Sequence, residues 1–195
     1  MTNNCQDNAP RAMDPALERK TFTKKGLILV HTGDGKGKST AAFGTAARAL
    51  GRGYKVAIVQ FIKGNWKTGE SKFFQNLGEQ CHMSSMGEGF TWDTKNFEQD
   101  VATAKRAWEK CRSLLNDDVH QLVIFDEINY VLHYNFLDLP TILAELKKKP
   151  PMKHVVLTGN YAPAPLIDIA DLVTEMKCIK HPYQVGIKAQ PGIDY

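Results

Sequence analysis

The chain has 195 residues, of which 43% are hydrophobic and 24% are charged, the size and balance of one globular domain with a substantial core. Its 25 Lys and Arg residues barely exceed its 21 Asp and Glu residues, without the long basic blocks that typically bind nucleic acid. No apolar run approaches the roughly 18 residues needed to span a bilayer, and the N-terminus has no basic-then-apolar signal pattern. We therefore expect a cytoplasmic protein that binds neither nucleic acid nor membranes.

The cysteines and histidines form no recognisable site. The four cysteines are far apart and contain no C-x-x-C pair, which argues against a zinc site and a disulfide framework. The six histidines show no metal-ligand spacing, and no G-x-S-x-G elbow of a hydrolase is present. The positions concerned are Cys5, Cys81, Cys111, Cys178, His31, His82, His120, His133, His154 and His181.

Two regions are distinguished along the chain. Residues 1–25 are polar, and Asp14 followed by Pro15 predicts a short helix through Lys20 that lies outside the main core. From Gly26 to Tyr195 the sequence predicts one α/β domain. It opens with an apolar strand at 26–31, a glycine-rich loop, a helix at 40–50 and a second strand at 54–61, a succession that favours parallel pairing.

The rest of the domain continues this alternation. Residues 62–95 are harder to interpret, with a short helix at 71–77 and a weak strand at 81–86. Apolar residues then recur at spacings of four and three from Phe97 to Leu115, which predicts a long amphipathic helix with Asn96 as its cap. Strands are predicted at 121–125, 154–158 and 172–176, and helices at 140–148 and 165–170. We expect a mostly parallel central sheet flanked by helices.

A phosphate-binding loop is predicted between the first strand and the first helix. Its glycines allow the backbone N–H groups to face an anion, and the helix N-terminus adds partial positive charge. Lys38 can reach phosphate oxygens, and the Ser39 hydroxyl is a suitable ligand for Mg²⁺. Thr32 replaces the first glycine of the usual motif, and Lys36 is either a second phosphate contact or a solvated side chain. The candidate ATP-binding residues are Thr32, Gly33, Asp34, Gly35, Lys36, Gly37, Lys38, Ser39 and Thr40.

A second motif supports the first. Leu122 to Phe125 is an apolar strand that ends in Asp126 and Glu127, and ligands collect at such strand ends in open α/β sheets. We predict that one or both acids act on the metal, together with Ser39. The alternative is that either acid caps the helix that follows.

Two aromatic residues, Phe90 and Trp92, lie in the glycine-rich stretch GEGFTWD. Large aromatic side chains in an exposed loop suggest a flat hydrophobic ligand. The alternative, equally weighted on spacing alone, is that both rings fold under the loop as a small satellite core.

With these residues identified, the chain resembles the P-loop ATP:cob(I)alamin adenosyltransferases, also called corrinoid or cob(I)yrinic acid a,c-diamide adenosyltransferases. The resemblance extends from about Gly26 to Tyr195 and is far more specific than a phosphate loop alone. It is carried by T-G-D-G-K-G-K-S-T-A-A-F-G-T-A-A-R-A at 32–49, V-Q-F-I-K-G at 59–64, G-F-T-W at 89–92, F-D-E-I-N-Y at 125–130 and G-I-K-A-Q-P-G-I-D-Y at 186–195. Residue chemistry offers no mechanism for the last of these motifs.

The resemblance implies a RecA-like fold, a homodimer and attack of Co(I) on C5′ of ATP, with triphosphate as the leaving group. It implies that Gly33 to Ser39 hold the triphosphate in a sense reversed from P-loop kinases, and that Lys38 and Glu127 are catalytic. Ser39 and Glu127 then hold Mg²⁺, with Mn²⁺ as the alternative metal, and Asp126 assists through water. The acceptor is cob(I)alamin or another corrinoid, in adenosylcobalamin synthesis or corrinoid salvage.

By the same resemblance, Phe90 and Trp92 cover the lower face of the corrin and displace its axial ligand. The resulting four-coordinate Co(II) is easier for a flavodoxin-type donor to reduce. Two positions depart from the common pattern: Asp34 replaces a frequent Asn, and Asn160 replaces a frequent Arg. The competing functions are an ordinary P-loop phosphotransferase or NTPase, which would release ADP and phosphate, and a RecA-like nucleic-acid ATPase, which the near balance of charge disfavours.

Overall fold

The computed structural model describes residues 23–62, 68–86 and 97–195. Six strands form one sheet in the order β3-β2-β4-β5-β1-β6, and every neighbouring pair is parallel. This confirms the predicted parallel α/β architecture. The strands are β1 (Ile28–Thr32), β2 (Val56–Gln60), β3 (Cys81–Ser85), β4 (Leu122–Asp126), β5 (His154–Thr158) and β6 (Leu172–Glu175).

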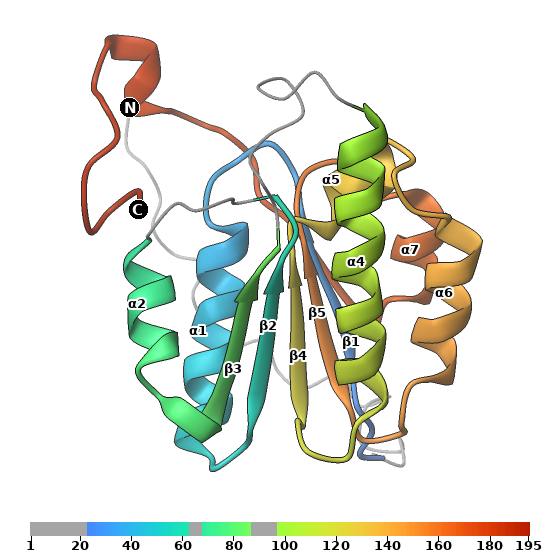
Figure 1. Cartoon of the computed structure of the whole chain (residues 1–195). Helices are drawn as coiled ribbons and strands as arrows, with labels where there is room; N and C mark the ends of the chain where they lie inside the picture. The colour runs from blue at the N-terminus through green and yellow to red at the C-terminus, as the bar shows by residue number, and fades with distance from the viewer. Residues whose placement is uncertain (1–22, 63–67, 87–96) are drawn as a thin grey trace, which may run out of the picture.

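Helices cover both faces of the sheet, so the domain has three layers (Figure 1). Helices α1 and α2 pack on one face, and α4, α5, α6 and α7 contribute to the core on the other. Their bounds are α1 (Lys38–Gly51), α2 (Gly69–Gln75), α4 (Phe97–Asn116), α5 (Ile128–His133), α6 (Leu139–Lys148) and α7 (Ala164–Ile169), with 3-10 turns η1 (Gly78–Gln80) and η2 (Pro182–Val185).

The central strands β2 and β4 are buried along their whole length. Helices on both faces exclude water from them, which is why their sequences are continuously apolar rather than alternating. All six predicted strands are confirmed, including the weak one at β3. No helix in the described ranges is long and apolar enough to cross a membrane.

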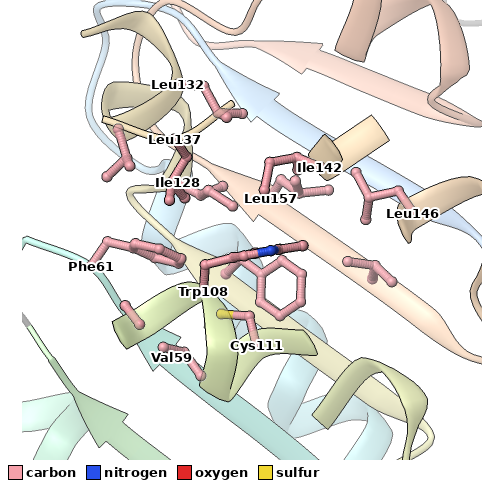
Figure 2. Close-up of a cluster of buried hydrophobic side chains, with 14 of the residues drawn as sticks. Val59, Phe61, Trp108, Cys111, Ile128, Leu132, Leu137, Ile142, Leu146 and Leu157 are labelled. Atoms are coloured by element: carbon pink, nitrogen blue, oxygen red, sulfur yellow. The ribbon is translucent and has the colours of Figure 1, made fainter. Parts of the chain in front are cut away.

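The predicted amphipathic stripe of α4 is confirmed. Trp108 and Cys111 are buried in the core (Figure 2). The Trp108 ring meets Phe125 of β4 edge to face with centroids 6.0 Å apart. The first residue of the stripe is different, because Phe97 is 58% exposed, with its ring edge-on to Phe136 at a centroid distance of 5.4 Å.

Helix α5 was expected from the sequence only as a helix that follows Asp126 and Glu127, without bounds. It has only six residues, too few for a helical period to show against the apolar residues around it. The predicted helix at 15–20, the Asn96 cap and the aromatic residues Phe90 and Trp92 lie outside the described residues.

Candidate active site

The phosphate loop joins the carboxyl end of β1 to the N-terminus of α1. Gly37 is the N-cap residue of α1 and has φ 109°, a left-handed conformation suited to glycine. Lys38 is the first residue of α1. Its Nζ donates hydrogen bonds to the carbonyl oxygens of Gly33, at 2.8 Å, and Gly35, at 2.7 Å. The ammonium group is therefore held over its own loop, at the end of the helix where N–H groups attract an anion.

Lys38 is buried and surrounded by acidic residues. Burial lowers its pKa, whereas the negative charges of Glu127, Asp34 and Asp126 act in the opposite direction. Such a cation in a partly desolvated site interacts more strongly with an added anion than a solvated lysine would. The loop thus holds a positive charge beside glycine backbone that carries no side chains, as expected for a phosphate site.

The outer side of the loop is held by the C-terminal segment, residues 176–195. Met176 N donates to the Thr32 carbonyl at 2.8 Å, and Gly35 N donates to the Met176 carbonyl at 2.7 Å. A Cβ atom at Gly33, which has φ 96°, would lie 2.3 Å from the Met176 oxygen. The close approach of these two backbones therefore requires glycine at this position.

Two polar side chains of the loop also contact the C-terminal segment. Asp34 Oδ1 accepts a hydrogen bond from Cys178 N at 3.2 Å, and Lys36 forms an ion pair with Asp194. Asp34 therefore binds main chain on the outer side of the loop. Lys36 was predicted to be a phosphate contact or a solvated side chain, and here it is paired. Asp194 belongs to the C-terminal motif for which the sequence offered no mechanism.

The two acids at the end of β4 have different environments. Asp126 has no exposed surface, and its two carboxylate oxygens accept hydrogen bonds from Gln60 Nε2, at 2.9 Å, and Thr158 Oγ1, at 2.7 Å. Glu127 is half-buried and close enough to Lys38 to influence its charge. It occupies the N-cap position of α5 without a capping hydrogen bond from its side chain, so the alternative role as a helix cap is not adopted.

Gln60, Asp126 and Thr158, which we name the polar row, lie side by side on three adjacent strands. Gln60 is in register with Asp126 across β2 and β4. They share the face of the sheet that carries Val56, Leu122 and Val156 further down, which pack with α1. The same sheet face is thus apolar along most of its length and polar at its carboxyl edge, below the phosphate loop.

His31 and Asn129 complete this edge. His31 of β1 is in register with Thr158. It is buried, and within the described residues neither ring nitrogen has a hydrogen-bond partner. Burial lowers its pKa. Asn129 Nδ2 donates to the carbonyl of Gly159 at 2.8 Å and to that of His31 at 3.3 Å, so one amide links the ends of β1 and β5.

The donor types present suit a hard divalent cation. Ser39 follows Lys38 at the start of α1 and offers a hydroxyl, and Glu127 offers a carboxylate; both are oxygen ligands that Mg²⁺ prefers beside phosphate oxygens. The described part of the chain contains no cluster of three His, Cys, Asp or Glu residues that could hold a metal by themselves.

Aromatic side chains gather beside the acids, on α5 and the loop after β5. The Tyr130 and Tyr134 rings are stacked 6.3 Å apart, and Tyr161 lies edge-on to Tyr130 and stacked on His133 at 4.5 Å. Tyr161 is 55% exposed. It also lines a cleft of about 530 Å³ that reaches Thr32 and the loop. The site therefore has an apolar, partly exposed side next to its charged one.

Some residues of this site were not identified from the sequence as functional. Gln60 and Asn129 were noted only as letters of longer motifs, and Thr158 only as the last residue of a predicted strand. A sequence pattern does mark two of them: Gln60 and Thr158 are polar residues at the ends of apolar strands, as Asp126 is. The predicted loop residues and Glu127 meet at one edge of the sheet, whereas Phe90 and Trp92 lie outside the described residues and stay a prediction.

Comparison with known proteins gives a consistent result. The family described as ATP:corrinoid adenosyltransferase BtuR/CobO/CobP matches residues 24–195. A corrinoid adenosyltransferase of Sinorhizobium sp. is 46% identical, covering 97% of this chain and 94% of its own length. A corrinoid adenosyltransferase of Pseudomonas aeruginosa is 48% identical, covering 88% of this chain and 85% of its own length. Among solved structures, the flagellar accessory protein FlaH of Methanocaldococcus jannaschii has a TM-score of 0.50 at 16% identity, covering 77% of this chain and 70% of its own, a likeness of fold alone.

Proposed function

We propose a residue-level account of catalysis that proceeds from the following premise: the chain belongs to the ATP:corrinoid adenosyltransferase BtuR/CobO/CobP family. Its reaction is accordingly the transfer of the adenosyl group of ATP to a corrinoid. The observation that supports our assignment is the meeting of the Lys38 loop and Glu127 at one edge of the sheet, with Lys38 under the influence of the Glu127 charge. The assigned residues are those of the loop, Thr32 to Thr40, together with Glu127.

In this account the loop binds the triphosphate of ATP. Backbone N–H groups at the start of α1 face the phosphates, and Lys38 exchanges its contacts with the Gly33 and Gly35 carbonyls for contacts with phosphate oxygens. Cobalt in the Co(I) state attacks C5′ of ATP, the C5′–O bond breaks with its electron pair, and triphosphate leaves. Lys38 stabilises the negative charge that grows on the leaving group, so its effect is greater in the transition state than in the ground state.

Ser39 and Glu127 would hold Mg²⁺ with the triphosphate, and the metal would neutralise part of the leaving-group charge. Mn²⁺ is the alternative metal. The hydroxyl and carboxylate fit that role by donor chemistry, whereas the fully buried Asp126 fits an indirect one.

The corrinoid is assigned to the aromatic side of the site. Phe90 and Trp92 are proposed to cover the corrin face and displace the axial ligand of Co(II), before reduction by a flavodoxin-type donor. The rings of Tyr130, Tyr134 and Tyr161 support the assignment of the corrinoid to this side, because a partly exposed aromatic surface suits a large flat macrocycle.

We also propose a cytoplasmic homodimer. The edge strand β6 is exposed along its length, and several apolar side chains of the C-terminal segment are exposed, among them Ile179 (89%) and Ile193 (84%). Unpaired strand edges and clustered apolar surface commonly pair with a second copy. Sedimentation of the full chain measures this directly: a monomer at micromolar concentration would contradict it.

The corrinoid assignment is tested with Phe90→Ala and Trp92→Ala. If the rings serve the corrinoid, unfolding stability and ATP affinity should hardly change. Activity should fall severely with Co(II) substrate and a protein reductant, and mildly with chemically prepared Co(I), which has already lost its axial ligand. If the rings were a satellite core, each truncation would lower stability by roughly 3 kcal/mol or more and reduce both activities together.

A further inference from the structure

The backbone of Glu127 has an unusual conformation. Its φ is 68°, in the left-handed region that a residue with a side chain adopts only when its surroundings impose it. This conformation directs the chain from β4 into α5 and decides where the Glu127 carboxylate lies. The structure must therefore contain groups that hold it.

One such group is the Thr158 hydroxyl. Glu127 N donates to Thr158 Oγ1 at 3.0 Å, and Thr158 Oγ1 lies 2.7 Å from Asp126 Oδ1. A hydroxyl has one proton to donate, and Thr158 Oγ1 donates it to Asp126 Oδ1. The proton of Thr158 therefore points to Asp126, which leaves an oxygen lone pair to receive the Glu127 N–H.

The far side of Asp126 is fixed in the same way. Its Oδ2 accepts from Gln60 Nε2 at 2.9 Å, and Gln60 Oε1 accepts from the Ser85 hydroxyl at 2.9 Å. This network also sets the orientation of the Gln60 amide. Two of these hydrogen bonds end on the Asp126 carboxylate, which has no exposed surface, and a polar group displaced in such surroundings would be costly.

From this geometry we infer that Thr158 is a positioning residue for Glu127, and that Asp126 and Gln60 act through Thr158 by fixing the direction of its hydroxyl. The inference rests on the proposed function for the part that concerns magnesium. It gives Asp126 a role without contact to the metal, and it gives a role to Thr158 and Gln60, which lie on two other strands.

The inference is tested first without any ligand. Thr158→Val keeps the shape of the side chain and removes the hydroxyl, and Thr158→Ser restores it. In the ligand-free protein, Thr158→Val should accelerate hydrogen exchange of the Glu127 amide by about tenfold or more, and Thr158→Ser should return it toward the parent rate. Thr103→Val, the same change at a buried position on α4, is the matched control. If the Glu127 amide of Thr158→Val exchanges at the parent rate, the inference is overturned.

The second measurement is the dissociation constant of ATP with and without Mg²⁺, by titration calorimetry. In Thr158→Val the gain in affinity from Mg²⁺ should fall about tenfold, while affinity in EDTA stays near the parent value. Gln60→Met should show a smaller loss of the same kind. A merely structural role for Thr158 would lower both affinities equally, and this result contradicts the inference. If Mg²⁺ does not change the ATP affinity of the parent protein, the metal assignment of the proposed function is contradicted instead. The exchange measurement then still decides the role of Thr158.

Discussion

The phosphate loop and Glu127 together form the charged side of the site, and they are held in different ways. The phosphate loop is held from outside, by backbone contacts with Met176 and an ion pair with Asp194. Glu127 is held from below, by side chains of the polar row that are buried in the sheet. The loop therefore depends on the absence of side chains at its glycines, whereas the position of Glu127 depends on particular hydrogen-bonding groups. The two should fail under different substitutions.

The largest effect is expected from Gly33→Ala. The new Cβ would lie 2.3 Å from the Met176 oxygen at a left-handed φ, so the loop or the C-terminal segment must move. We expect a loss of about 4 kcal/mol in unfolding free energy, and loss of ATP binding. Urea unfolding and calorimetry measure both.

Gly44→Ala is the control for that change. Gly44 lies in α1 with no atom within 4 Å of its would-be Cβ, so alanine should raise stability by about 0.5 to 1 kcal/mol. Equal behaviour of the two variants would show that the loop does not need its glycine.

The next largest effect is expected from Lys38→Ala. Removal of the ammonium takes away about 2 to 4 kcal/mol of transition-state stabilisation, so kcat should fall by roughly 30-fold to 1,000-fold. Stopped-flow detection of the cobalt–carbon product gives kcat. A near-normal value would remove Lys38 from the mechanism.

Glu127→Gln addresses the other side of the site. It keeps the shape of the side chain but replaces an anionic ligand with a neutral one, so the Mg²⁺ concentration for half-maximal activity should rise about tenfold. An unchanged metal titration would transfer the metal assignment to Asp126 and contradict the role we give the polar row.

His31 lies at the same edge of the sheet as the loop and Glu127, and within the described residues its ring hydrogen-bonds to neither. Because burial lowers its pKa below 6.5, the unfolded chain binds more protons than the folded one below that pH, and stability falls as pH falls. His31→Phe removes this group. Its stability relative to the parent should rise between pH 7 and pH 5, measured by urea unfolding at each pH. A pH-independent difference would contradict the assigned burial effect.

The smallest effect is expected from Asp194→Asn. The change frees Lys36 from its ion pair and removes a negative charge near the triphosphate, so ATP should bind about two- to threefold more tightly at low salt. The difference should disappear in high salt. Weaker binding would mean that Asp194 holds Lys36 in its productive position.

The sequence placed the loop between a strand and a helix because its glycines, lysine and serine are contiguous, and the structure confirms that placement. It singled out Glu127 from the strand that precedes it, and the metal-binding role of Glu127 stays a prediction. It could not predict that the polar row forms, because Gln60 and Asp126 are 66 residues apart and Asp126 and Thr158 are 32 residues apart, and only the strand order makes them neighbours. Nor could it explain the C-terminal motif, since the contact of Asp194 with Lys36 spans 158 positions.

The central claim is that this site cleaves ATP at C5′ and not at phosphorus. It is tested most directly by product analysis with ATP, Mg²⁺ and chemically reduced cobalamin under anoxic conditions. The account predicts one triphosphate released for each light-sensitive cobalt–carbon bond formed, and neither product without the corrinoid. Release of ADP and phosphate in place of triphosphate would contradict it.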